Sequence, residues 1–321
     1  IRDLEDVISK DRGNTAVFEK ARAQLNKTHR NQFAPEQIVK CVEAAVNAKT
    51  FDEGMAAEGK FFAECMKDPQ REALIHIFFA ERAANKIPGL GKDMPLIEIN
   101  KGSVIGAGTM GGGIVMCFAN AGIPVRMYDN DAANLQRGLK VIEGNYARTV
   151  SKGRLSQADM DKRMALITPT ENFDDLGDGD IVIEAVYENL DLKKEIFGKL
   201  DKVMKPGAIL ATNTSGLDVD AIAAMTTRPD HVCGMHFFSP ANVMRLLEVV
   251  RGKDSSPAVL GTAMALGKRL GKVSVVAGNC PGFIGNRMLG GYTRQASMMI
   301  LEGATPAQVD KVIYDFGLAM G

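Results

Sequence analysis

The stretch SVIGAGTMGGGIVMCFANAG, residues 103–122, decides the fold of this chain. An apolar run typical of a buried strand leads into Gly106, Gly108 and Gly111, spaced as G-x-G-x-x-G, and an apolar helical run follows. Such glycines allow a tight strand-to-helix turn, close approach of a pyrophosphate to the backbone, and close packing of the helix on a sheet. The first helical N–H groups then stabilise the phosphate charge. The pattern predicts a dinucleotide-binding turn.

A second strand is expected over PVRMYD, residues 124–129, and it ends in Asp129, about 20 residues beyond the turn. A carboxylate at this place accepts a hydrogen bond from a ribose 2′-hydroxyl and repels a 2′-phosphate. The cofactor predicted is therefore NAD rather than NADP. The alternative is a glycine-rich turn in an unrelated fold, with Asp129 only capping a strand, because a chain with 33 glycines can produce the spacing by chance.

Short β-rich runs continue to alternate with helical ones after this unit. Further strands are expected within residues 180–186, 208–213, 231–238, 246–250 and 272–278. Helical segments between most of these strands predict a parallel, doubly wound α/β sheet of the Rossmann type.

The part before this sheet reads as helical throughout. EQIVKCVEAAVNAK, residues 36–49, and DPQREALIHIFFAERAAN, residues 68–85, carry apolar residues at three- and four-residue spacing, and Pro69 opens the second. KIPGLGKDMP, residues 86–95, has the composition of a linker. Three domains are predicted: residues 1–97, all helical; residues 98–280, the NAD-binding domain; and residues 281–321, the start of a second helical domain. In the last of these, a helix capped by Thr305 is expected to end at Gly317.

Composition excludes several classes of function. With 39 basic and 39 acidic residues, nothing indicates a general nucleic-acid or anionic-membrane binder. No apolar run approaches the roughly 18 residues of a membrane span. The five cysteines are widely spaced and form no CxxC pair, so no metal site is expected and the thiols fit a reducing compartment.

One imidazole, His236, lies in the apolar run CGMHFFSP, residues 233–240. A lone histidine in such a run is more often a structural residue. A dinucleotide site favours the other interpretation, because hydride transfer from an alcohol needs a base for the hydroxyl proton. Glu248, in the apolar run RLLEVV, is a possible partner that would orient the ring; the alternative is a solvated glutamate at a strand edge.

Polar residues also occur at two element boundaries, in ATNTSG and in CPGFIGNRM. Asn213, Ser215 and Asn286 are candidates for contacts with a substrate or cofactor. Turn and cap duties explain all three equally well from local sequence alone.

Together these residues resemble a known family, the L-3-hydroxyacyl-CoA dehydrogenases, in the form found in multifunctional α-subunits of fatty-acid β-oxidation. The resemblance rests on VIGAGTMGGGI, YDND, IEAVYENLDLKKEIF, ATNTSGL, GMHFFSPANVMRLLEVV and CPGFIGNRML, in the family's order and spacing. The upstream helices look like the end of an enoyl-CoA hydratase half and its linker helix. The similarity therefore extends over nearly the whole chain.

The resemblance implies a role for each matching position. His236 would be the catalytic acid/base and Glu248 its orienting partner, while Ser215 and Asn286 would hold the C3 oxygen of the substrate. The cofactor site implied comprises Gly106, Gly108, Thr109, Met110, Gly111, Asp129, Ala185, Val186, Glu188, Lys193 and Asn213. The reaction implied is NAD-dependent oxidation of an L-3-hydroxyacyl-CoA to the 3-oxoacyl-CoA.

The resemblance also implies surroundings for this activity. An acyl-CoA substrate, a thiolase subunit in a larger complex and a homodimer are expected, in the bacterial cytoplasm or else the peroxisomal matrix. The chain has no initiator Met and ends soon after a helix, so we expect a segment of a longer protein that binds NAD with weak or no turnover and lacks the hydratase activity of its parent. The alternatives are a single-function 3-hydroxybutyryl-CoA dehydrogenase and a non-catalytic dinucleotide-binding segment.

Overall fold

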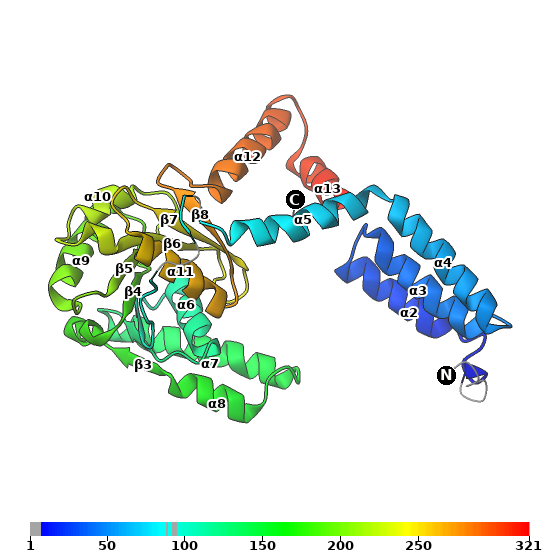
Figure 1. Ribbon diagram of the computed structural model, residues 1–321, viewed down its shortest axis with the longest axis horizontal. Helices are drawn as coiled ribbons and strands as arrows, with labels where there is room; N and C mark the ends of the chain where they lie inside the picture. Colours follow the sequence, from blue (N-terminus) through cyan, green and yellow to red (C-terminus); the bar gives the residue numbers. More distant parts are fainter. Residues whose placement is uncertain (1–7, 88, 92–94, 321) are drawn as a thin grey trace. The chain divides into compact units, whose positions relative to one another are not determined.

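The computed structural model describes residues 8–87, 89–91 and 95–320. The chain divides into two compact units, one formed by Glu81–Tyr292 and the other by Ile1–Ala80 with Thr293–Gly321. The first unit carries the sheet and the second consists of helices (Figure 1). Within the described residues no helix is long and apolar enough to cross a membrane.

The elements of the sheet unit follow the predicted alternation. The strands are β1 (Gly102–Ile105), β2 (Val125–Tyr128), β3 (Ile167–Thr170), β4 (Ile181–Glu184), β5 (Ile209–Thr212), β6 (Val232–Phe237), β7 (Leu246–Arg251) and β8 (Val273–Gly278). The helices are α6 (Thr109–Asn120), α7 (Ala132–Ser151), α8 (Gln157–Ala165), α9 (Leu190–Val203), α10 (Val219–Ala223) and α11 (Pro257–Arg269), with short 3₁₀ turns η1 (Phe173–Asp178) and η2 (Pro229–His231).

The strands of the described residues form one sheet in the order β3-β2-β1-β4-β5-β6-β7-β8. Chain order reverses at β1, with β2 on one side and β4 on the other, as in doubly wound sheets. All pairs are parallel except β6 and β7, which are antiparallel. This differs from the parallel sheet predicted throughout, because no helix lies between these two strands to carry the chain back.

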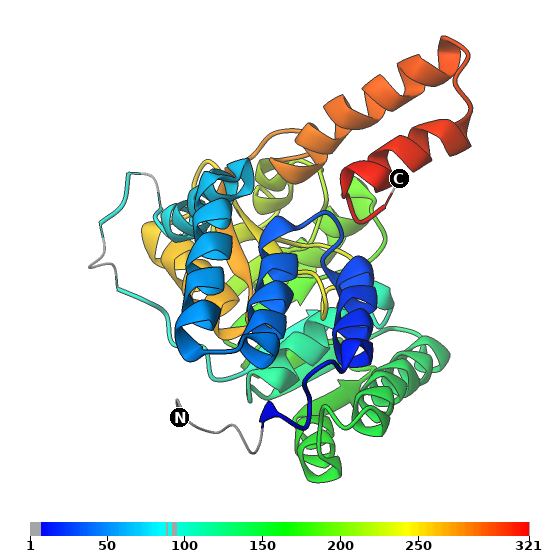
Figure 2. The same cartoon turned by 90° about the vertical axis from the view of Figure 1, so that its right-hand side faces the viewer.

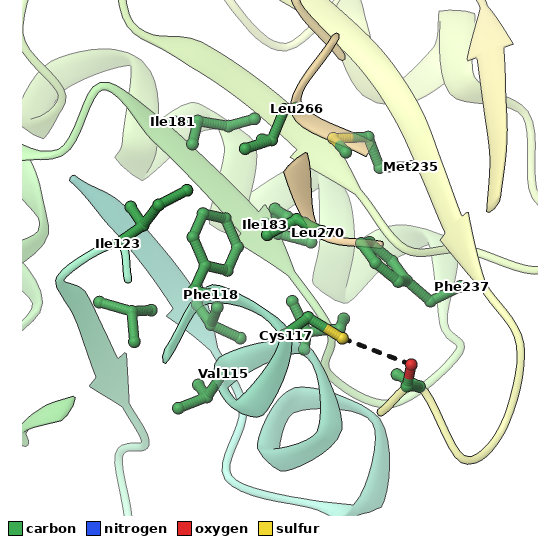
Figure 3. Packing of buried hydrophobic residues seen from close by; sticks show 14 of the residues in the cluster. Val115, Cys117, Phe118, Ile123, Ile181, Ile183, Met235, Phe237, Leu266 and Leu270 are labelled. Atoms are coloured by element: carbon green, nitrogen blue, oxygen red, sulfur yellow. Dashed lines mark hydrogen bonds between the residues drawn. The ribbon is translucent and has the colours of Figure 1, made fainter. Parts of the chain in front are cut away.

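Both faces of the sheet are buried, as parallel strands require. Alternate residues of β4 show this directly. Ile181 and Ile183 pack with α6 and α11, as Figure 3 shows for Phe118 and Leu266, whereas Val182 packs with Phe197 and other residues of α9 and α10. The carboxyl ends of the strands are thereby fixed between two helical layers.

The helical unit contains α2 (Thr15–Thr28), α3 (Phe33–Asn47), α4 (Phe51–Lys67) and most of α5 (Pro69–Ala84). Figure 2 shows α2, α3 and α4, drawn in blue, side by side. Most of α12 (Gly285–Leu301) and all of α13 (Pro306–Phe316) belong to the same unit. The turn after α2 contacts α13, with the Arg30 guanidinium over the Tyr314 ring at 3.5 Å.

Several local predictions are confirmed. Pro69 opens α5, Thr305 caps α13 with a capping box, and Gly317 ends that helix with φ of 120°. The edge strand β3 was not predicted, because Pro169 and the polar threonines on either side of it hide its pattern. The predicted linker lies partly outside the described residues, since these omit positions 88 and 92–94.

Candidate active site

The turn between β1 and α6 requires glycine at two positions. Gly106 has φ of +103°, in the left-handed region, and a Cβ there would lie 2.7 Å from the carbonyl oxygen of Ala185. A Cβ on Gly111 would lie 1.8 Å from the carbonyl oxygen of Gly106. These two glycines let β1, α6 and the end of β4 pack against one another.

Gly108 has a different function from its two neighbours. It is the N-cap of α6 and provides no side-chain hydrogen bond to the first turn. A Cβ there would meet nothing within 4 Å, so packing of the described residues does not require glycine at this position. The unpaired N–H groups of a helix start and the open space above them suit an anion close to the backbone.

Asp129 follows β2 and is anchored to this turn. Its Oδ2 accepts a hydrogen bond from the Ala107 N–H at 2.9 Å, and its Oδ1 accepts one from the Asp131 N–H at 3.1 Å. These bonds fix the carboxylate at the carboxyl end of the sheet, where ligands of doubly wound folds bind.

A cleft of about 1120 Å³ runs along this edge of the sheet. Of the residues predicted to bind the cofactor, its lining includes Gly106, Gly108, Thr109, Asp129, Ala185 and Val186. The lining does not include Met110, Gly111, Glu188, Lys193 or Asn213. Met110 is partly buried and packs against the hydrophobic core.

His236 and Glu248 face each other across the antiparallel strands β6 and β7. The imidazole Nδ1 lies 2.7 Å from Glu248 Oε2, and the two side chains are 6% and 0% exposed. The rings of Phe238 and Phe283 flank the imidazole, with centroids 4.4 Å and 5.8 Å away. The alternative that Glu248 is solvated is therefore wrong.

The second oxygen of Glu248 is also satisfied. Its Oε1 accepts hydrogen bonds from the N–H groups of Ile284 and Gly285, at 3.0 Å and 2.7 Å. Burial alone would raise the pKa of Glu248, but the bonds from His236 and these amides outweigh it and lower the pKa below its usual value. An ionised Glu248 assigns the proton of neutral His236 to Nδ1, which leaves Nε2 as an acceptor.

Ser215 and Asn286 lie together, as the resemblance implied. The Asn286 Nδ2 donates to the carbonyl oxygen of Ser215 at 3.2 Å, although the two residues come from the loop after β5 and from α12. The Ser215 hydroxyl donates to Glu188 Oε1 at 3.0 Å. Asn213 acts within the same loop, where its Oδ1 accepts the Phe237 N–H at 2.8 Å and joins the end of β5 to β6.

Lys193 is paired with two carboxylates. It lies in α9, is 1% exposed, and its Nζ is 2.7 Å from Glu184 Oε1 and 3.3 Å from Glu188 Oε2. Glu184 ends β4 and is 0% exposed; it was not predicted as a site residue. A carboxylate in the apolar run DIVIEAV was a usable signal, because such a group needs a buried partner.

The family follows from comparison with known proteins. The NAD binding domain of 3-hydroxyacyl-CoA dehydrogenase matches residues 101–280, and the C-terminal domain of 3-hydroxyacyl-CoA dehydrogenase matches residues 282–321. The chain belongs to the 3-hydroxyacyl-CoA dehydrogenase family. Residues 101–280 of this dehydrogenase chain are thus its NAD-binding domain, which confirms the cofactor predicted from the glycine turn and Asp129.

Curated relatives of this dehydrogenase chain include a bifunctional enzyme and a subunit of a complex. The peroxisomal bifunctional enzyme of Danio rerio is 45% identical over 96% of this chain and 43% of its own length. The fatty acid oxidation complex subunit alpha of a Psychrobacter species is 35% identical over 100% of this chain and 44% of its own length. The dehydrogenase chain thus spans less than half the length of these relatives.

A solved structure shows the same fold. The (S)-3-hydroxybutyryl-CoA dehydrogenase of Ralstonia eutropha has a TM-score of 0.68 and 37% identity, over 70% of this chain and 80% of its own. The predicted family and the Rossmann-like fold are confirmed.

Proposed function

We propose that this chain is the dehydrogenase part of a multifunctional β-oxidation enzyme and oxidises the C3 hydroxyl of an L-3-hydroxyacyl-CoA to a ketone. The observation that carries the proposal is the buried His236–Glu248 pair, with Nδ1 and Oε2 2.7 Å apart. It supplies a base for an alcohol proton in the same domain as an NAD cleft. A protein that only bound a dinucleotide would have no use for that base.

The residues of the cleft fit NAD. The open space over Gly108 and the uncapped start of α6 suit the pyrophosphate, and Asp129 suits an adenosine ribose without a 2′-phosphate. Thr109, Ala185 and Val186 line the same cleft. When bound, NAD⁺ supplies the hydride acceptor of the reaction.

His236 takes up the proton of the substrate hydroxyl, and Glu248 orients the His236 ring. The substrate hydroxyl transfers its proton to Nε2 of His236, while Glu248 keeps the other ring proton on Nδ1. The imidazolium that forms is stabilised by the buried Glu248 carboxylate, because a charge pair is stronger in a low-dielectric site. In the reverse direction the same imidazolium returns the proton to the ketone oxygen.

Ser215 and Asn286 hold the oxygen at C3. The Asn286 amide keeps a second N–H besides the one bonded to the Ser215 carbonyl, and this N–H can donate to the C3 oxygen. The Ser215 hydroxyl donates to Glu188, so its oxygen is left to accept from the substrate hydroxyl. A donor aimed at the C3 oxygen stabilises the charge that develops on it during hydride transfer.

The test is a single turnover with NAD⁺ and (S)-3-hydroxybutyryl-CoA, with the chain in excess and NADH fluorescence as the signal. NADH formation with the (S) substrate and none with the (R) enantiomer is expected. NAD binding without any hydride transfer would favour the non-catalytic alternative. The weak turnover expected from the sequence stays a prediction, and a single turnover registers hydride transfer even when steady-state cycling is slow.

The wider setting is inferred from the relatives. Matches that include the helices before residue 87 favour a multifunctional parent over a single-function 3-hydroxybutyryl-CoA dehydrogenase. The name of the bacterial relative supports a larger complex, in which a thiolase subunit is the expected partner; a homodimer also stays a prediction. For the compartment, the more identical peroxisomal relative favours the peroxisomal matrix over the bacterial cytoplasm.

A further inference from the structure

The turn between β8 and α12 has a strained backbone. Gly282 and Phe283 follow one another with φ of 73° and 47°, both in the left-handed region. Glycine adopts this conformation readily, but a side chain as bulky as that of Phe283 rarely does. Such strain persists only where the surrounding structure holds the backbone in place. The contacts at the two ends of this turn therefore decide whether it keeps its shape.

The turn places two groups of the proposed site. Phe283 is 2% exposed, and its ring flanks the His236 imidazole. Asn286, in the first turn of α12, donates to the carbonyl oxygen of Ser215. Because both groups belong to the turn or follow it directly, a change of backbone conformation in the turn would displace both.

Glu248 holds the end of the turn that enters α12. Its Oε1 accepts hydrogen bonds from the N–H groups of Ile284 and Gly285, while its Oε2 is paired with His236. The start of α12 is thereby fixed relative to the base. The opposite end of the turn, just after β8, needs a contact of its own.

Asn279 provides that contact. Its Oδ1 accepts a hydrogen bond from the Val219 N–H at 3.1 Å. Its Nδ2 donates to Asp218 Oδ1 at 2.7 Å and to Asp220 Oδ2 at 2.8 Å. These partners lie at the start of α10, directly after the loop that carries Ser215. One amide thus joins the turn to the segment after β5.

The same two segments also touch through their backbones. A Cβ on Gly216 would lie only 3.2 Å from the backbone nitrogen of Gly282, so the Ser215 loop and the strained turn are closely packed. Asn279 before this contact and Asn286 after it bond to the same segment.

We infer that Asn279 is a positioning residue for the substrate oxygen. By joining the turn to the segment after β5, it keeps Gly282 and Phe283 in their strained conformation and keeps Asn286 aligned with Ser215. The inference rests on the proposed function, in which Asn286 and Ser215 hold the C3 oxygen. The three hydrogen bonds of the Asn279 side chain go to protein groups, so it acts through the turn.

An amide suits these partners because it both accepts and donates hydrogen bonds. The bond from Asn279 lowers the pKa of Asp218 below its usual value, against the effect of burial. An aspartate of the same size could still accept from the Val219 N–H. It would, however, lose the donor and put a third carboxylate beside Asp218 and Asp220, and the three would repel one another.

The test compares Asn279→Asp with the unmodified chain in single turnovers with NAD⁺ and (S)-3-hydroxybutyryl-CoA. Hydride transfer should slow by about tenfold to a hundredfold, the loss expected when an orienting group moves by about 1 Å. NADH affinity, measured by nicotinamide fluorescence, should stay nearly unchanged, because the glycine turn is built from β1 and α6. Asn100→Asp, the same substitution at an exposed residue before β1, is the matched control and should match the unmodified chain in both measurements.

A double-mutant cycle with Asn286→Ala shows whether Asn279 acts through Asn286. If it does, Asn279→Asp should slow hydride transfer much less in the Asn286→Ala background, because the group that it positions is already missing. A general loss of stability would slow both backgrounds by the same factor. Denaturant unfolding checks that each variant is folded, and Asn279→Ala, which adds no charge, takes the place of Asn279→Asp if that variant does not fold.

Hydrogen exchange gives a measurement that does not depend on activity. The amides of Ile284 and Gly285 are bonded to Glu248 and should exchange slowly in the unmodified chain. In Asn279→Asp they should exchange faster, because the turn before them is no longer held at its other end. The amides of the buried strand β1 serve as the internal reference and should not change.

Four results would overturn the inference. An unchanged rate of hydride transfer in a folded variant would remove the positioning role, and equal slowing in both backgrounds of the cycle would make Asn279 a residue of general stability. Unchanged exchange at Ile284 and Gly285 would show that Asn279 does not hold the turn. If the unmodified chain transfers no hydride, the proposed function fails and the positioning role with it, and that outcome is visible before any variant is made.

Discussion

The glycine turn after β1 and the surroundings of His236 and Lys193 are built in different ways. The glycine turn is made of backbone and depends on missing side chains, because Gly106 and Gly111 have no room for a Cβ. The regions around His236 and Lys193 are made of buried charged or polar side chains that satisfy one another. The first kind of site depends on local backbone geometry, whereas the second depends on partners brought together by the sheet.

The largest effect on activity is expected from His236→Gln, which changes the His236–Glu248 pair and leaves the glycine turn as it is. Hydride transfer should fall by roughly 10²–10⁴-fold, because the amide cannot accept and return the hydroxyl proton. NADH affinity should stay unchanged, since His236 does not line the NAD cleft. Single-turnover rates and nicotinamide fluorescence measure the two quantities, and a variant that keeps its rate would refute the assignment of the base.

Gly111→Ala changes the glycine turn between β1 and α6. A Cβ 1.8 Å from the Gly106 oxygen forces the turn apart. The free energy of unfolding should therefore fall by about 1–3 kcal/mol. Most of the NADH binding should also be lost. Gly108→Ala is the matched control: it should unfold like the parent, because its Cβ meets nothing, yet bind NADH more weakly. Denaturant unfolding and NADH titration test both variants, and equal stability of the two would contradict the packing argument.

Glu248→Gln should slow hydride transfer by about tenfold to a hundredfold, because the imidazolium loses a charge-assisted bond. The substitution should also change the pH dependence of stability. The lowered pKa of Glu248 means that its contribution is present above the usual carboxyl pKa and is lost as pH falls through the folded value. The free energy of unfolding should therefore fall less steeply for the variant as the pH is lowered from neutral to acid. An unchanged dependence on pH would count against the lowered pKa.

The smallest effect is expected from Asp129→Asn. The amide oxygen can still accept from Ala107, so the link between β2 and the turn should stay intact, although the bond from the Asp131 N–H is lost. Loss of the negative charge should raise NADPH affinity severalfold and lower NADH affinity modestly, as parallel titrations would show. Unaltered preference for NADH would mean that Asp129 does not select the cofactor.

The sequence was most informative where structure is local. The glycine spacing, together with the apolar strand before it and the apolar helix after it, predicted the roles of Gly106 and Gly111. The next strand pattern placed Asp129 at a strand end. Met110 belongs to the same motif, and its partial burial against the core could not be predicted from the glycine spacing.

Partners across the sheet were harder to predict. The His236–Glu248 pair was proposed from two apolar runs, but its geometry depends on an antiparallel register that the expected parallel sheet did not include. Glu184 and Lys193 meet only because α9 packs over the end of β4. A buried carboxylate in a strand signals that a partner exists, whereas its identity depends on tertiary packing.

The antiparallel pairing of β6 and β7 also bears on how this enzyme can diversify. His236 and Glu248 are joined by strand register, so the connection between the strands can lengthen or change composition while the pair stays in place. Pro240 and Asn242 in that connection line the cleft. Ligand preference can thus be altered in the loop independently of the proton-transfer chemistry, which makes residues 239–245, beyond the Phe238 ring that flanks His236, the natural segment for a library of engineered variants.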